Sequence, residues 1–580
     1  MLKCVLSLII LACLSSNIST MSSPVTSTIN NCDVTIVGGG IGGIYSAWRL
    51  INSSYVPANR VCIMEQTSRV GGRQYSVKGL FPFTTSVDVG AHRFDPNVHV
   101  ITTFIIQNLL KLNTSCFSKT PDCIENGNSI FNLRNRHNLT FDTSAGLPYK
   151  FLSSEKWGPG HSRSEMPDPL SDIASYLPFI ENNYEDLTSQ DDSIRYPAIQ
   201  KVMKKMNKRL INGLHTYQQC VRSATNYSSE LWSFLLDTIG ESQTILYNSI
   251  YDLFRNSIFE LVNDVHGEKL LVITDANGNE IGYSTSSEQL LAKIVSQGAR
   301  IFYQHKLASV YRDTSNPNNM RLTFANGATT TSQTVFLNIP TTSLYQLSAD
   351  SVIFTDANDT VKEAMNLFIP QPAVKMYGYY EDAWWKTKLG LDHDEGYTTN
   401  ELKFFGLVDG VTKCTSPTTC KGVVLMSYPD GENTKYFETV QNDKDSPLVI
   451  VNSNTTDPVE LTWMKDAHSL FVNSFKPYFR QKNIDPDTIP LPKTIVMGVW
   501  QAAWHYGPVN NFPGGQTNAL SLKPVNNLKL FWVNEANSID QGWAEGSLLM
   551  AEKAANMLGL SRPSFLGNNY WYDAMILTDL

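Results

Sequence analysis

The clearest pattern in the chain is a short apolar run, then a cluster of glycines, then a helical repeat, all within residues 33–50. The run from Val34 to Val37 is typical of a buried strand, and apolar residues return at helical spacing from Ile44. A second apolar run, "RVCIMEQ", predicts another strand that ends at Glu65. The order of strand, tight turn, helix and strand predicts the start of a parallel α/β sheet.

The periodicity then changes several times along the chain. Residues 150–265 have mainly helical spacing, whereas 285–345 alternate between helix and strand patterns. Residues 345–525 are rich in strand patterns, and 525–562 return to a strand, a loop and a helix. We therefore predict an α/β fold in which a Rossmann-like domain is built from three chain segments, with a mixed α+β domain and an inserted helical domain.

The glycines have the spacing of a dinucleotide cradle, Gly38-x-Gly40-x-x-Gly43. The first glycine permits a sharp turn, the second lets the backbone approach a pyrophosphate, and the third lets helix and strand pack closely. Glu65 follows Gly43 by about 20 residues, where an acid binds the ribose hydroxyls. The alternative is a glycine-rich turn with an incidental glutamate.

Two short segments follow the second strand. "SRVGGRQYSV" offers Gly71, Gly72 and Arg73 to a second stretch of phosphate. "DVGAHRFDPNVHVITTFIIQNLLKL" predicts a helix with Asp95 as its N-cap and a proline in its first turn. Arg93 therefore lies just before the predicted helix start.

The charge balance argues against a polyanion partner. The net charge is −8 and the isoelectric point is about 5.7, whereas neutralising phosphates needs clustered Lys and Arg. One basic cluster lies within 201–209, and its helical spacing favours the solvated face of a packed helix over a membrane-binding surface. We expect no nucleic acid among the partners.

Residues 1–20 resemble a secretory signal peptide, with Lys3 ahead of about ten apolar residues and then small polar ones. This run is too short to span a bilayer, and no later apolar stretch reaches spanning length. We therefore predict a secreted protein without stable membrane insertion.

The cysteines and glycosylation sequons fit an oxidising compartment. Cys116 with Cys123, and Cys414 with Cys420, are close enough in sequence to close surface loops. Cys32 and Cys62 lie on predicted buried strands, where we expect them to be plain apolar filling. Asn-x-Ser/Thr sequons suit a glycoprotein, although chance would supply several; they begin at Asn52, Asn113, Asn138, Asn226, Asn358 and Asn454.

Taken together, the motifs resemble the flavin-containing amine oxidases, and among them the secreted L-amino-acid oxidases. The motifs are "IVGGGIGG" with Glu65, "RVGGR", "DVGAHRF", "AVKMYGYYEDAWW", "LMSYPDGEN", "QAAWHYGP" and "NEANSIDQGWAEG". The resemblance implies that the dinucleotide is FAD. It is expected to bind non-covalently, because no cysteine follows Cys420 to form the thioether of some relatives. The implied domains are a signal peptide at 1–20, an FAD-binding domain at 32–95, 285–345 and 525–562, a substrate-binding domain at 96–150 and 346–524, and a helical domain at 151–284.

The resemblance also assigns the cofactor contacts. Leu307 falls where the family offers a backbone contact to adenine, although packing alone would make that position apolar. Asn534 departs from the usual glycine of the closing motif, which puts the local backbone geometry in question. The implied cofactor-binding residues are Gly38, Gly40, Gly43, Glu65, Gly72, Arg73, Leu307, Glu535, Gly542 and Trp543.

For the substrate, the resemblance nominates Arg93 and Lys375 as catalytic. Arg93 would bind a substrate carboxylate through two parallel hydrogen bonds, unless it forms only a surface ion pair or a phosphate contact. Lys375 would hold a water beside the flavin, and a lysine in an apolar strand is costly to bury without such a partner. The implied substrate-binding residues are Arg93, Tyr428, His505, Gly542 and Trp543, with core packing as the alternative for Tyr428 and a structural role as the alternative for His505.

The expected activity is FAD-dependent oxidation of L-amino acids to 2-oxo acids, with release of ammonia and hydrogen peroxide. The expected partners are a small-molecule amino acid and O2, and a homodimer is left open. A polyamine or monoamine oxidase shares the fold and cofactor, and a secreted binding protein without turnover is a third alternative. His92 replaces an apolar family residue and bears on the subclass. We expect no metal, because no His, Cys, Asp and Glu set has ligand spacing and no H-E-x-x-H is present.

Overall fold

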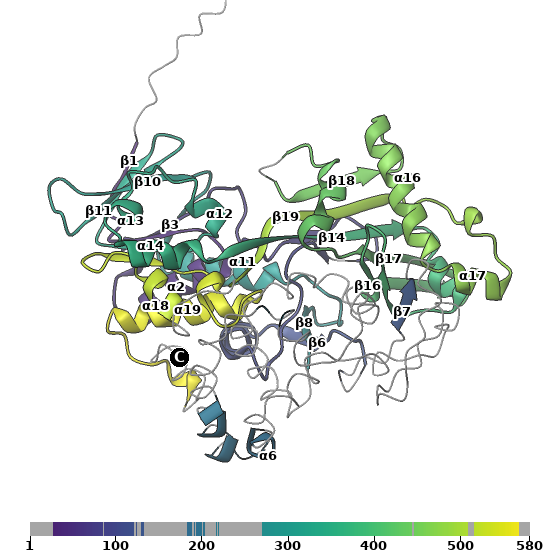
Figure 1. Cartoon of the computed structure of the whole chain (residues 1–580), viewed down its shortest axis with the longest axis horizontal. Coiled ribbons are helices and arrows are strands. Elements are labelled where there is room, and N and C mark those ends of the chain that lie inside the picture. Colours follow the sequence, from purple (N-terminus) through teal and green to yellow (C-terminus); the bar gives the residue numbers. More distant parts are fainter. Residues whose placement is uncertain are drawn as a thin grey trace, which may run out of the picture.

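The computed structural model describes residues 27–84, 86–120, 123, 129–132, 269–443, 446–507 and 516–567, together with short stretches between 183 and 219. These residues form two lobes joined by the long strands β14 (Ile369–Tyr380) and β19 (Thr494–Tyr506), which run from one lobe into the other (Figure 1). One lobe combines segments from the start, middle and end of the chain, and the other is formed mainly by the segment between β14 and β19.

The first lobe is organised around a five-stranded parallel sheet. Its order is β20-β13-β2-β3-β9, so strands from three distant segments are neighbours. The strand β2 is buried on both faces, as its unbroken apolar run predicted. This order confirms a Rossmann-like sheet built from three chain segments. The strands are β2 (Val34–Val37), β3 (Val61–Met64), β9 (Arg300–Phe302), β13 (Thr334–Leu337) and β20 (Lys529–Trp532).

Different layers cover the two faces of this sheet. Helices α2 (Ile41–Asn52), α11 (Ser284–Ser296) and α19 (Ala544–Met557) pack on one face in a shared apolar core. A second core fills the other face, under a four-stranded sheet of order β1-β12-β11-β10. Its strands are β1 (Thr28–Ile29), β10 (Leu307–Arg312), β11 (Met320–Phe324) and β12 (Thr329–Ser332).

The second lobe contains a seven-stranded sheet of order β18-β19-β14-β17-β16-β15-β7, antiparallel except between β15 and β7. Helices α16 (Pro458–Asn473) and α17 (Lys476–Lys482) lie at its outer end (Figure 1), and an aromatic core joins them to the sheet. The strands not yet placed are β7 (Ser129–Asn132), β15 (Glu395–Thr398), β16 (Phe404–Ser416), β17 (Thr419–Ser427) and β18 (Leu448–Asn452).

Short elements complete the described chain. Two further strand pairs are β4 (Ser76–Lys78) with β5 (Ser86–Asp88), and β6 (Asn113–Cys116) with β8 (Leu271–Thr274). The short helices are η1 (Ala58–Arg60), α3 (Val100–Thr103), η2 (Phe104–Leu109), α6 (Tyr184–Leu187), α12 (Thr341–Leu344), α13 (Val352–Thr355), α14 (Asp359–Asn366), η7 (Trp385–Leu389), η8 (Gly431–Thr434), α15 (Lys435–Glu438), η9 (Pro486–Thr488), α18 (Gln516–Leu522), η10 (Glu535–Asn537) and η11 (Ser564–Leu566).

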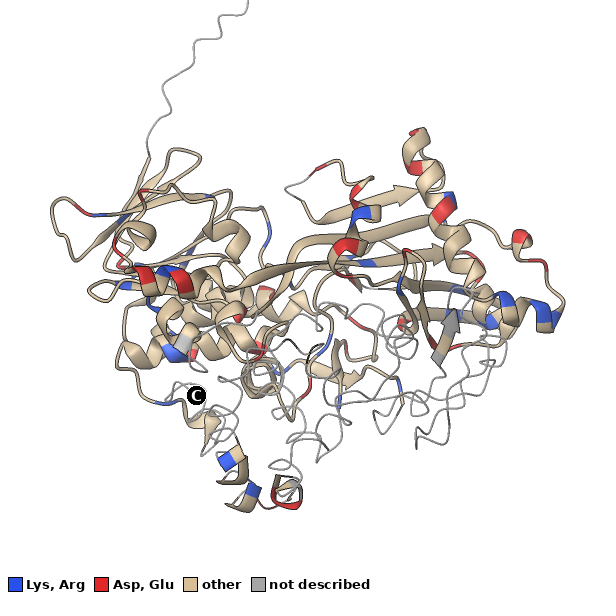
Figure 2. Ribbon diagram, viewed as in Figure 1, with Lys and Arg blue, Asp and Glu red and all other residues tan. Residues whose placement is uncertain are grey.

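Charged residues of both signs alternate along both lobes (Figure 2). Within the described ranges, every helix is too short or too polar to cross a bilayer. The predicted signal peptide, most of the basic cluster at 201–209, and nearly all of the predicted helical region at 150–265 lie outside the described residues.

The cysteines correct one prediction. Cys32 and Cys62 are not plain apolar filling but form a disulfide, with their Cα atoms 5.5 Å apart. Cys32 lies just before β2, and Cys62 lies on the adjacent parallel strand β3, whose register brings it opposite Thr35. The segment before β2 thus lies beside β3, and sequence spacing could not show that contact. The predicted pairs, Cys116 with Cys123 and Cys414 with Cys420, are also disulfides.

Two element boundaries also differ from the prediction. Asp95 does not cap a helix: its Oδ1 accepts from Asn97 N (2.7 Å), and α3 begins later with His99 as N-cap. The bounds given to the helical domain, 151–284, also take in the strand β8, which pairs with β6 and lies beyond the helical spacing of 150–265. An apolar run as short as "LLVIT" fits a strand as well as a helix, and only its pairing partner decides between them.

Candidate functional site

A cavity of about 1020 Å³ lies between the two lobes, and the carboxyl ends of the parallel strands open into it. Ligands in α/β folds bind at this edge of the sheet. Every residue that the sequence nominated for the cofactor or the substrate lines this cavity: Gly38, Gly40, Gly43, Glu65, Gly72, Arg73, Arg93, Leu307, Lys375, Tyr428, His505, Glu535, Gly542 and Trp543.

The glycine turn has the geometry that its spacing predicts. Gly38 has φ +104°, and a Cβ on Gly43 would lie 2.1 Å from the Gly38 carbonyl oxygen. A Cβ on Gly40 would meet only Gly72 Cα, at 3.9 Å, so hydrogen there leaves space free inside the cavity. Gly38 and Gly43 are therefore required by the backbone, whereas Gly40 keeps the cavity open.

Helix α2 starts at this turn without an internal anion. Its N-cap is Gly40, which has no side chain to accept a hydrogen bond, and its first turn contains no acid. The partial positive charge at the helix N-terminus is therefore available to an external anion, as in dinucleotide-binding folds. This end of the cavity fits the pyrophosphate of a dinucleotide.

Glu65 follows the end of β3 and is buried against the turn. Its Oε2 accepts from Gly39 N (2.8 Å), and its Oε1 accepts from the N and Oγ1 atoms of Thr67 (both 2.8 Å). Each carboxylate oxygen can accept more than one bond, so this anchored acid can also receive ribose hydroxyls. Leu307, the first residue of β10, is buried nearby in the cavity wall.

Arg73 connects the start of the chain to its C-terminal motif. Its guanidinium donates to Glu535 Oε2 (2.6 Å) and to the carbonyl of Ala503 (3.0 Å). Burial alone would raise the pKa of Glu535, but Arg73 and His505 hold it well below its ordinary value. Arg73 is thus positioned by an ion pair and is not free to contact phosphate alone, which the sequence could not show.

His505 is completely engaged inside the protein. Nδ1 lies 2.8 Å from Glu535 Oε1, and Nε2 lies 2.8 Å from Thr341 Oγ1. With both ring nitrogens occupied, the geometry favours a role in orienting Glu535 over the direct substrate contact expected from the sequence.

The departure at Asn534 does not strain the backbone. Its φ of −147° is extended, and its side chain accepts from Ala536 N (2.9 Å) at the start of η10. Asparagine therefore fits where a glycine was expected. Gly542 has φ +90°, and Trp543 follows it as the N-cap of α19.

Trp543 lies against a buried histidine and an apolar wall. Its ring centroid is 4.6 Å from that of His99, and burial lowers the pKa of His99 to about 3. The indole also packs beside an apolar cluster that contains Phe117 and Val408. Trp543 can therefore form a rigid wall of the cavity.

Arg93, Lys375 and Tyr428 converge on the part of the cavity lined by β14 and β16. The Arg93 guanidinium carbon lies 4.4 Å from the Phe117 ring centroid, and Lys375 Nζ lies 5.2 Å from that of Tyr428. Burial lowers the pKa of Lys375, the charge of Asp409 opposes this and the charge of Arg93 adds to it. The three predicted residues therefore share one electrostatic environment, although their positions in the sequence are far apart.

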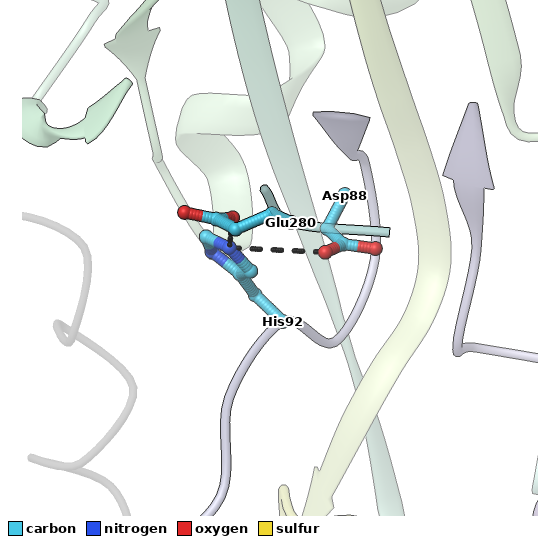
Figure 3. Close-up of side chains that lie close together, drawn as sticks. All are labelled: Asp88, His92 and Glu280. Atoms are coloured by element: carbon cyan, nitrogen blue, oxygen red, sulfur yellow. Dashed lines mark hydrogen bonds and ion pairs between the residues drawn. The ribbon is translucent and has the colours of Figure 1, made fainter. Parts of the chain in front are cut away.

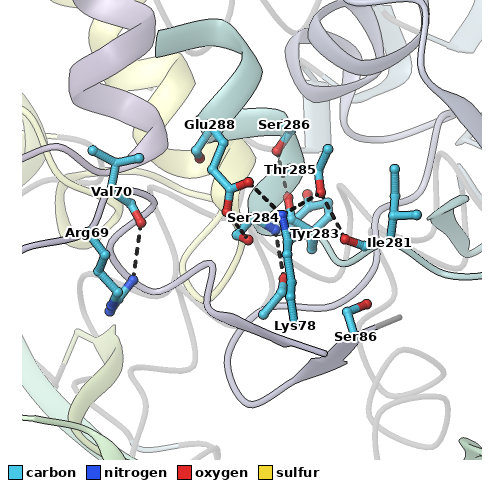
Figure 4. A network of polar contacts seen from close by, with 12 residues as sticks. Arg69, Val70, Lys78, Ser86, Ile281, Tyr283, Ser284, Thr285, Ser286 and Glu288 are labelled. Carbon is cyan, nitrogen blue, oxygen red and sulfur yellow. Dashed lines mark hydrogen bonds and ion pairs between the residues drawn. The ribbon is translucent and has the colours of Figure 1, made fainter. Parts of the chain in front are cut away.

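A polar network joins the hairpin β4–β5 to the start of α11 (Figure 4). Lys78 Nζ contacts Glu288 Oε2 (2.5 Å) and Thr285 Oγ1 (3.1 Å). Ser284 Oγ donates to the other oxygen of Glu288 (2.8 Å), and Ser86 Oγ donates to the Glu280 carbonyl (3.2 Å). These contacts place two carboxylates, one from the hairpin and one from the segment before α11, beside His92.

His92 lies in a buried cluster with Asp88 and Glu280 (Figure 3). Its Nε2 is 3.0 Å from Glu280 Oε2 and 3.7 Å from Asp88 Oδ2. Burial raises the pKa of Asp88, whereas for Glu280 the hydrogen bond and charge of His92 outweigh burial and lower it.

Folding therefore assembles ligand-type side chains that sequence spacing did not reveal. The ligand atoms of Asp88, His92 and Glu280 lie within 4.8 Å of one another. They already bond to each other and to protein donors, since Asp88 accepts from Ser76 Oγ and Tyr283 N. We describe them as a hydrogen-bonded cluster that orients His92.

Two further residues of the cavity wall were not nominated from the sequence. Arg69 donates to the carbonyl of Gly72 (2.7 Å) and stacks 3.8 Å from the Tyr75 ring centroid, which stiffens the second glycine turn. Asp409 faces the cavity from β16. It is an isolated acid in "FFGLVDGV". A charge within an apolar strand is the same signal that supported Lys375, so Asp409 could have been nominated from the sequence.

Comparison with known proteins gives two partial sequence matches. A family model described as an NAD(P)-binding Rossmann-like domain matches residues 36–104. An uncharacterized protein of Acanthamoeba polyphaga mimivirus is 40% identical over 83 residues. That match spans 14% of this chain and 16% of the viral protein.

Comparison of whole structures extends the likeness over most of the chain. Wild-type putrescine oxidase bound to putrescine matches with a TM-score of 0.55 at 12% identity, covering 92% of this chain and all of that one. A double mutant from a redesign of cofactor binding in putrescine oxidase gives 0.56 at 12% identity, with the same coverage. At this identity the similarity is one of fold: the chain shares the fold of putrescine oxidase.

Proposed function

We propose that this protein is a secreted FAD-dependent oxidase that converts L-amino acids to 2-oxo acids, ammonia and hydrogen peroxide. The observation that carries the proposal is the joint placement of Arg93, Lys375 and Tyr428 in the same cavity as the glycine cradle. A cation that can grip a carboxylate thus shares one chamber with a dinucleotide-binding turn.

The residues of the first lobe fit FAD. Gly38, Gly40 and Gly43 shape the turn for a pyrophosphate, and Glu65 would hold the ribose. The Arg73–Glu535 pair would close the far end of the same cavity. FAD supplies a two-electron acceptor, and its reoxidation by O2 yields hydrogen peroxide.

The chain's own residues would bind and orient the amino acid. The planar guanidinium of Arg93 can donate two parallel hydrogen bonds to the carboxylate, and the Tyr428 hydroxyl can donate a third. This grip would fix the Cα hydrogen relative to the cofactor, and positioning of that kind is most of what the reaction requires from the protein. The amino acid loses one hydrogen from Cα as hydride and one proton from nitrogen, and water then converts the imino acid to the oxo acid and ammonia.

Lys375 would act on a water molecule in the same chamber. Burial lowers its pKa, so its ammonium group gives up a proton more readily than that of an exposed lysine. A neutral or charged amine at this position can hold a water by hydrogen bonds and assist the reaction with O2.

Secretion is supported by the disulfides and the sequons. The three disulfides of the described residues suit an oxidising compartment. Asn52, Asn113 and Asn454 are exposed sequon residues, as glycosylation requires. Recovery of the protein from culture medium, with a mass that falls on enzymatic deglycosylation, tests both features.

The second candidate is oxidation of a polyamine or monoamine, which has no carboxylate to hold. The structural likeness to putrescine oxidase favours it. A binding protein without turnover is the third candidate, and it would release no peroxide with any amine or amino acid.

The test is peroxide release from the purified protein with the L-amino acids, their D-forms and common amines. We expect activity with L-amino acids, and Arg93→Leu should raise their KM by about 100-fold or more, because two charge-assisted hydrogen bonds are lost. Arg93→Lys keeps the charge but not the fork, so its KM should fall between the two. Activity confined to amines and unchanged by Arg93→Leu would refute the proposal.

A further inference from the structure

Asp409 is the unusual acid of the cavity wall. Its side chain is 9% exposed, and among the described residues its carboxylate accepts no hydrogen bond. His92 Nδ1 lies 3.9 Å from Asp409 Oδ1, which is too long for a hydrogen bond, and Lys375 is a second cation within electrostatic reach of Asp409. A carboxylate in this position is costly unless something in the cavity binds it.

The other acids of the same wall are already satisfied. Glu65 accepts from Gly39 and Thr67, Glu535 pairs with Arg73 and His505, and Glu395 accepts from Tyr397 Oη (3.2 Å). Among the cavity acids of the described residues, Asp409 is the one whose carboxylate accepts no hydrogen bond: its Oδ1 lies toward His92 and its Oδ2 lies toward Gly406.

His92 cannot neutralise Asp409 by itself. One imidazole ring faces three carboxylates, and its closer contacts are with Glu280 (3.0 Å) and Asp88 (3.7 Å). A single imidazole carries at most one positive charge, so His92 cannot balance all three carboxylates.

The protein holds the Asp409 segment in place. Lys119 Nζ donates to the carbonyl oxygens of Val408 (3.2 Å) and Gly410, the residues on either side. The pairing of β16 with β17 is irregular between Gly406 and Val411, so this segment bulges from the sheet. A lysine that clamps both flanking carbonyls fixes the bulge with its central side chain in the cavity wall.

On the basis of the proposed function, we infer that Asp409 receives a second ammonium group of the substrate, so that the preferred substrates are L-amino acids whose side chain ends in a cation. Arg93 and Asp409 then bind opposite charges of the same molecule in one chamber. The α-nitrogen is a poor occupant for Asp409, because it must be neutral when hydride leaves the adjoining carbon and a carboxylate would keep it protonated.

The test compares substrates that differ only in the distal group. We expect kcat/KM for L-lysine to exceed that for L-norleucine by at least about tenfold, and Asp409→Asn to remove this preference. Glu395→Gln is the matched control: it removes a carboxylate from the same wall, but one already bonded to Tyr397, so the ratio should stay as in wild type.

Equilibrium binding gives a readout that is independent of turnover. Calorimetric titration with 6-aminohexanoate and hexanoate measures the distal ammonium without an oxidisable α-amine. Wild type should favour 6-aminohexanoate by at least about tenfold, and Asp409→Asn should bind both equally.

The outcomes separate this inference from the proposed function. Equal losses for L-lysine and L-norleucine in Asp409→Asn, or a wild-type ratio near one, overturn the inference while leaving amino-acid oxidation intact. If only diamines are oxidised but the 6-aminohexanoate preference depends on Asp409, the proposed function fails and the ammonium site stands.

Discussion

Gly40 and Gly43 of the cradle provide the sharpest test of the cofactor site, because a Cβ at Gly40 would enter open space and a Cβ at Gly43 would meet the backbone. Gly40→Ala adds a methyl group whose nearest protein atom is 3.9 Å away, so the fold can accept it. Gly43→Ala places the same group 2.1 Å from the Gly38 carbonyl oxygen and 3.2 Å from Ile36 Cγ2. The two substitutions are chemically identical but should act on different properties.

The expected magnitudes follow from these contacts. At Gly43, backbone atoms must move by roughly 1 Å, and overpacking of this kind costs about 1–3 kcal/mol. The better helix propensity of alanine offsets about 1 kcal/mol of that cost. At Gly40, alanine as an N-cap costs less than about 1 kcal/mol of stability. Its methyl group should nevertheless block a phosphate from the helix N-terminus and weaken FAD binding by about 1.5 kcal/mol or more, at least tenfold in Kd.

The assay is titration of deflavinated protein with FAD, followed by quenching of flavin fluorescence, together with the melting temperature of the deflavinated form. Gly40→Ala should melt within a few degrees of wild type but bind FAD at least about tenfold more weakly. Gly43→Ala should lower both stability and affinity. If Gly40→Ala bound FAD as tightly as wild type, the backbone at this turn would not lie against the dinucleotide, and the cradle argument would be refuted.

Three further predictions concern the catalytic lysine, a buried carboxyl group and a disulfide. Lys375→Met should slow reoxidation of the reduced flavin by O2 by about 100-fold and leave anaerobic reduction nearly unchanged in stopped-flow experiments; an equal effect on both steps would contradict the assigned role. Burial raises the pKa of Glu545 to about 7, so the folded state keeps a proton that the unfolded chain releases near pH 4.5. The free energy of unfolding should therefore fall by about 3 kcal/mol as the pH rises from 4.5 to about 7, and should level off above that. In urea titrations at several pH values, Glu545→Gln should abolish this dependence on pH. If the variant kept the same dependence, the Glu545 carboxyl group would not be its source. Replacing Cys32 and Cys62 by valine should lower the free energy of unfolding by about 3 kcal/mol, because their disulfide closes a loop of 30 residues. With reductant present, which opens all three disulfides of the described residues, wild type and the variant should be equally stable.

The parts of the site that the sequence predicted are those whose residues are close together in the sequence. The cradle needs Gly38, Gly40 and Gly43 within one turn, and a single turn is encoded by neighbouring residues. Lys375 was nominated by the family resemblance of its motif, and a charge within an apolar strand supported the nomination. In both cases the signal lies within a few residues, so no knowledge of tertiary contacts was needed.

The parts that were missed depend on contacts between distant segments. Cys32 and Cys62 meet because the segment before β2 lies beside β3, and the sequence does not show which strands are neighbours. Glu280 reaches His92 from a segment assigned to a helical domain, so their pairing had no local signal. Asp409 could have been nominated from the sequence as a charge within an apolar strand. That its carboxylate accepts no hydrogen bond from the described residues becomes visible only in the folded structure.

The order of strands in the parallel sheet has a consequence for biosynthesis. The strand β13 lies between β2 and β20, so one of its edges is completed only by residues 529–532, near the end of the chain. A ribosome must therefore have made the chain as far as residue 532 before the five-stranded sheet can be completed. Until then an apolar strand edge is exposed, and we expect nascent chains to depend on chaperones and premature termination products to aggregate.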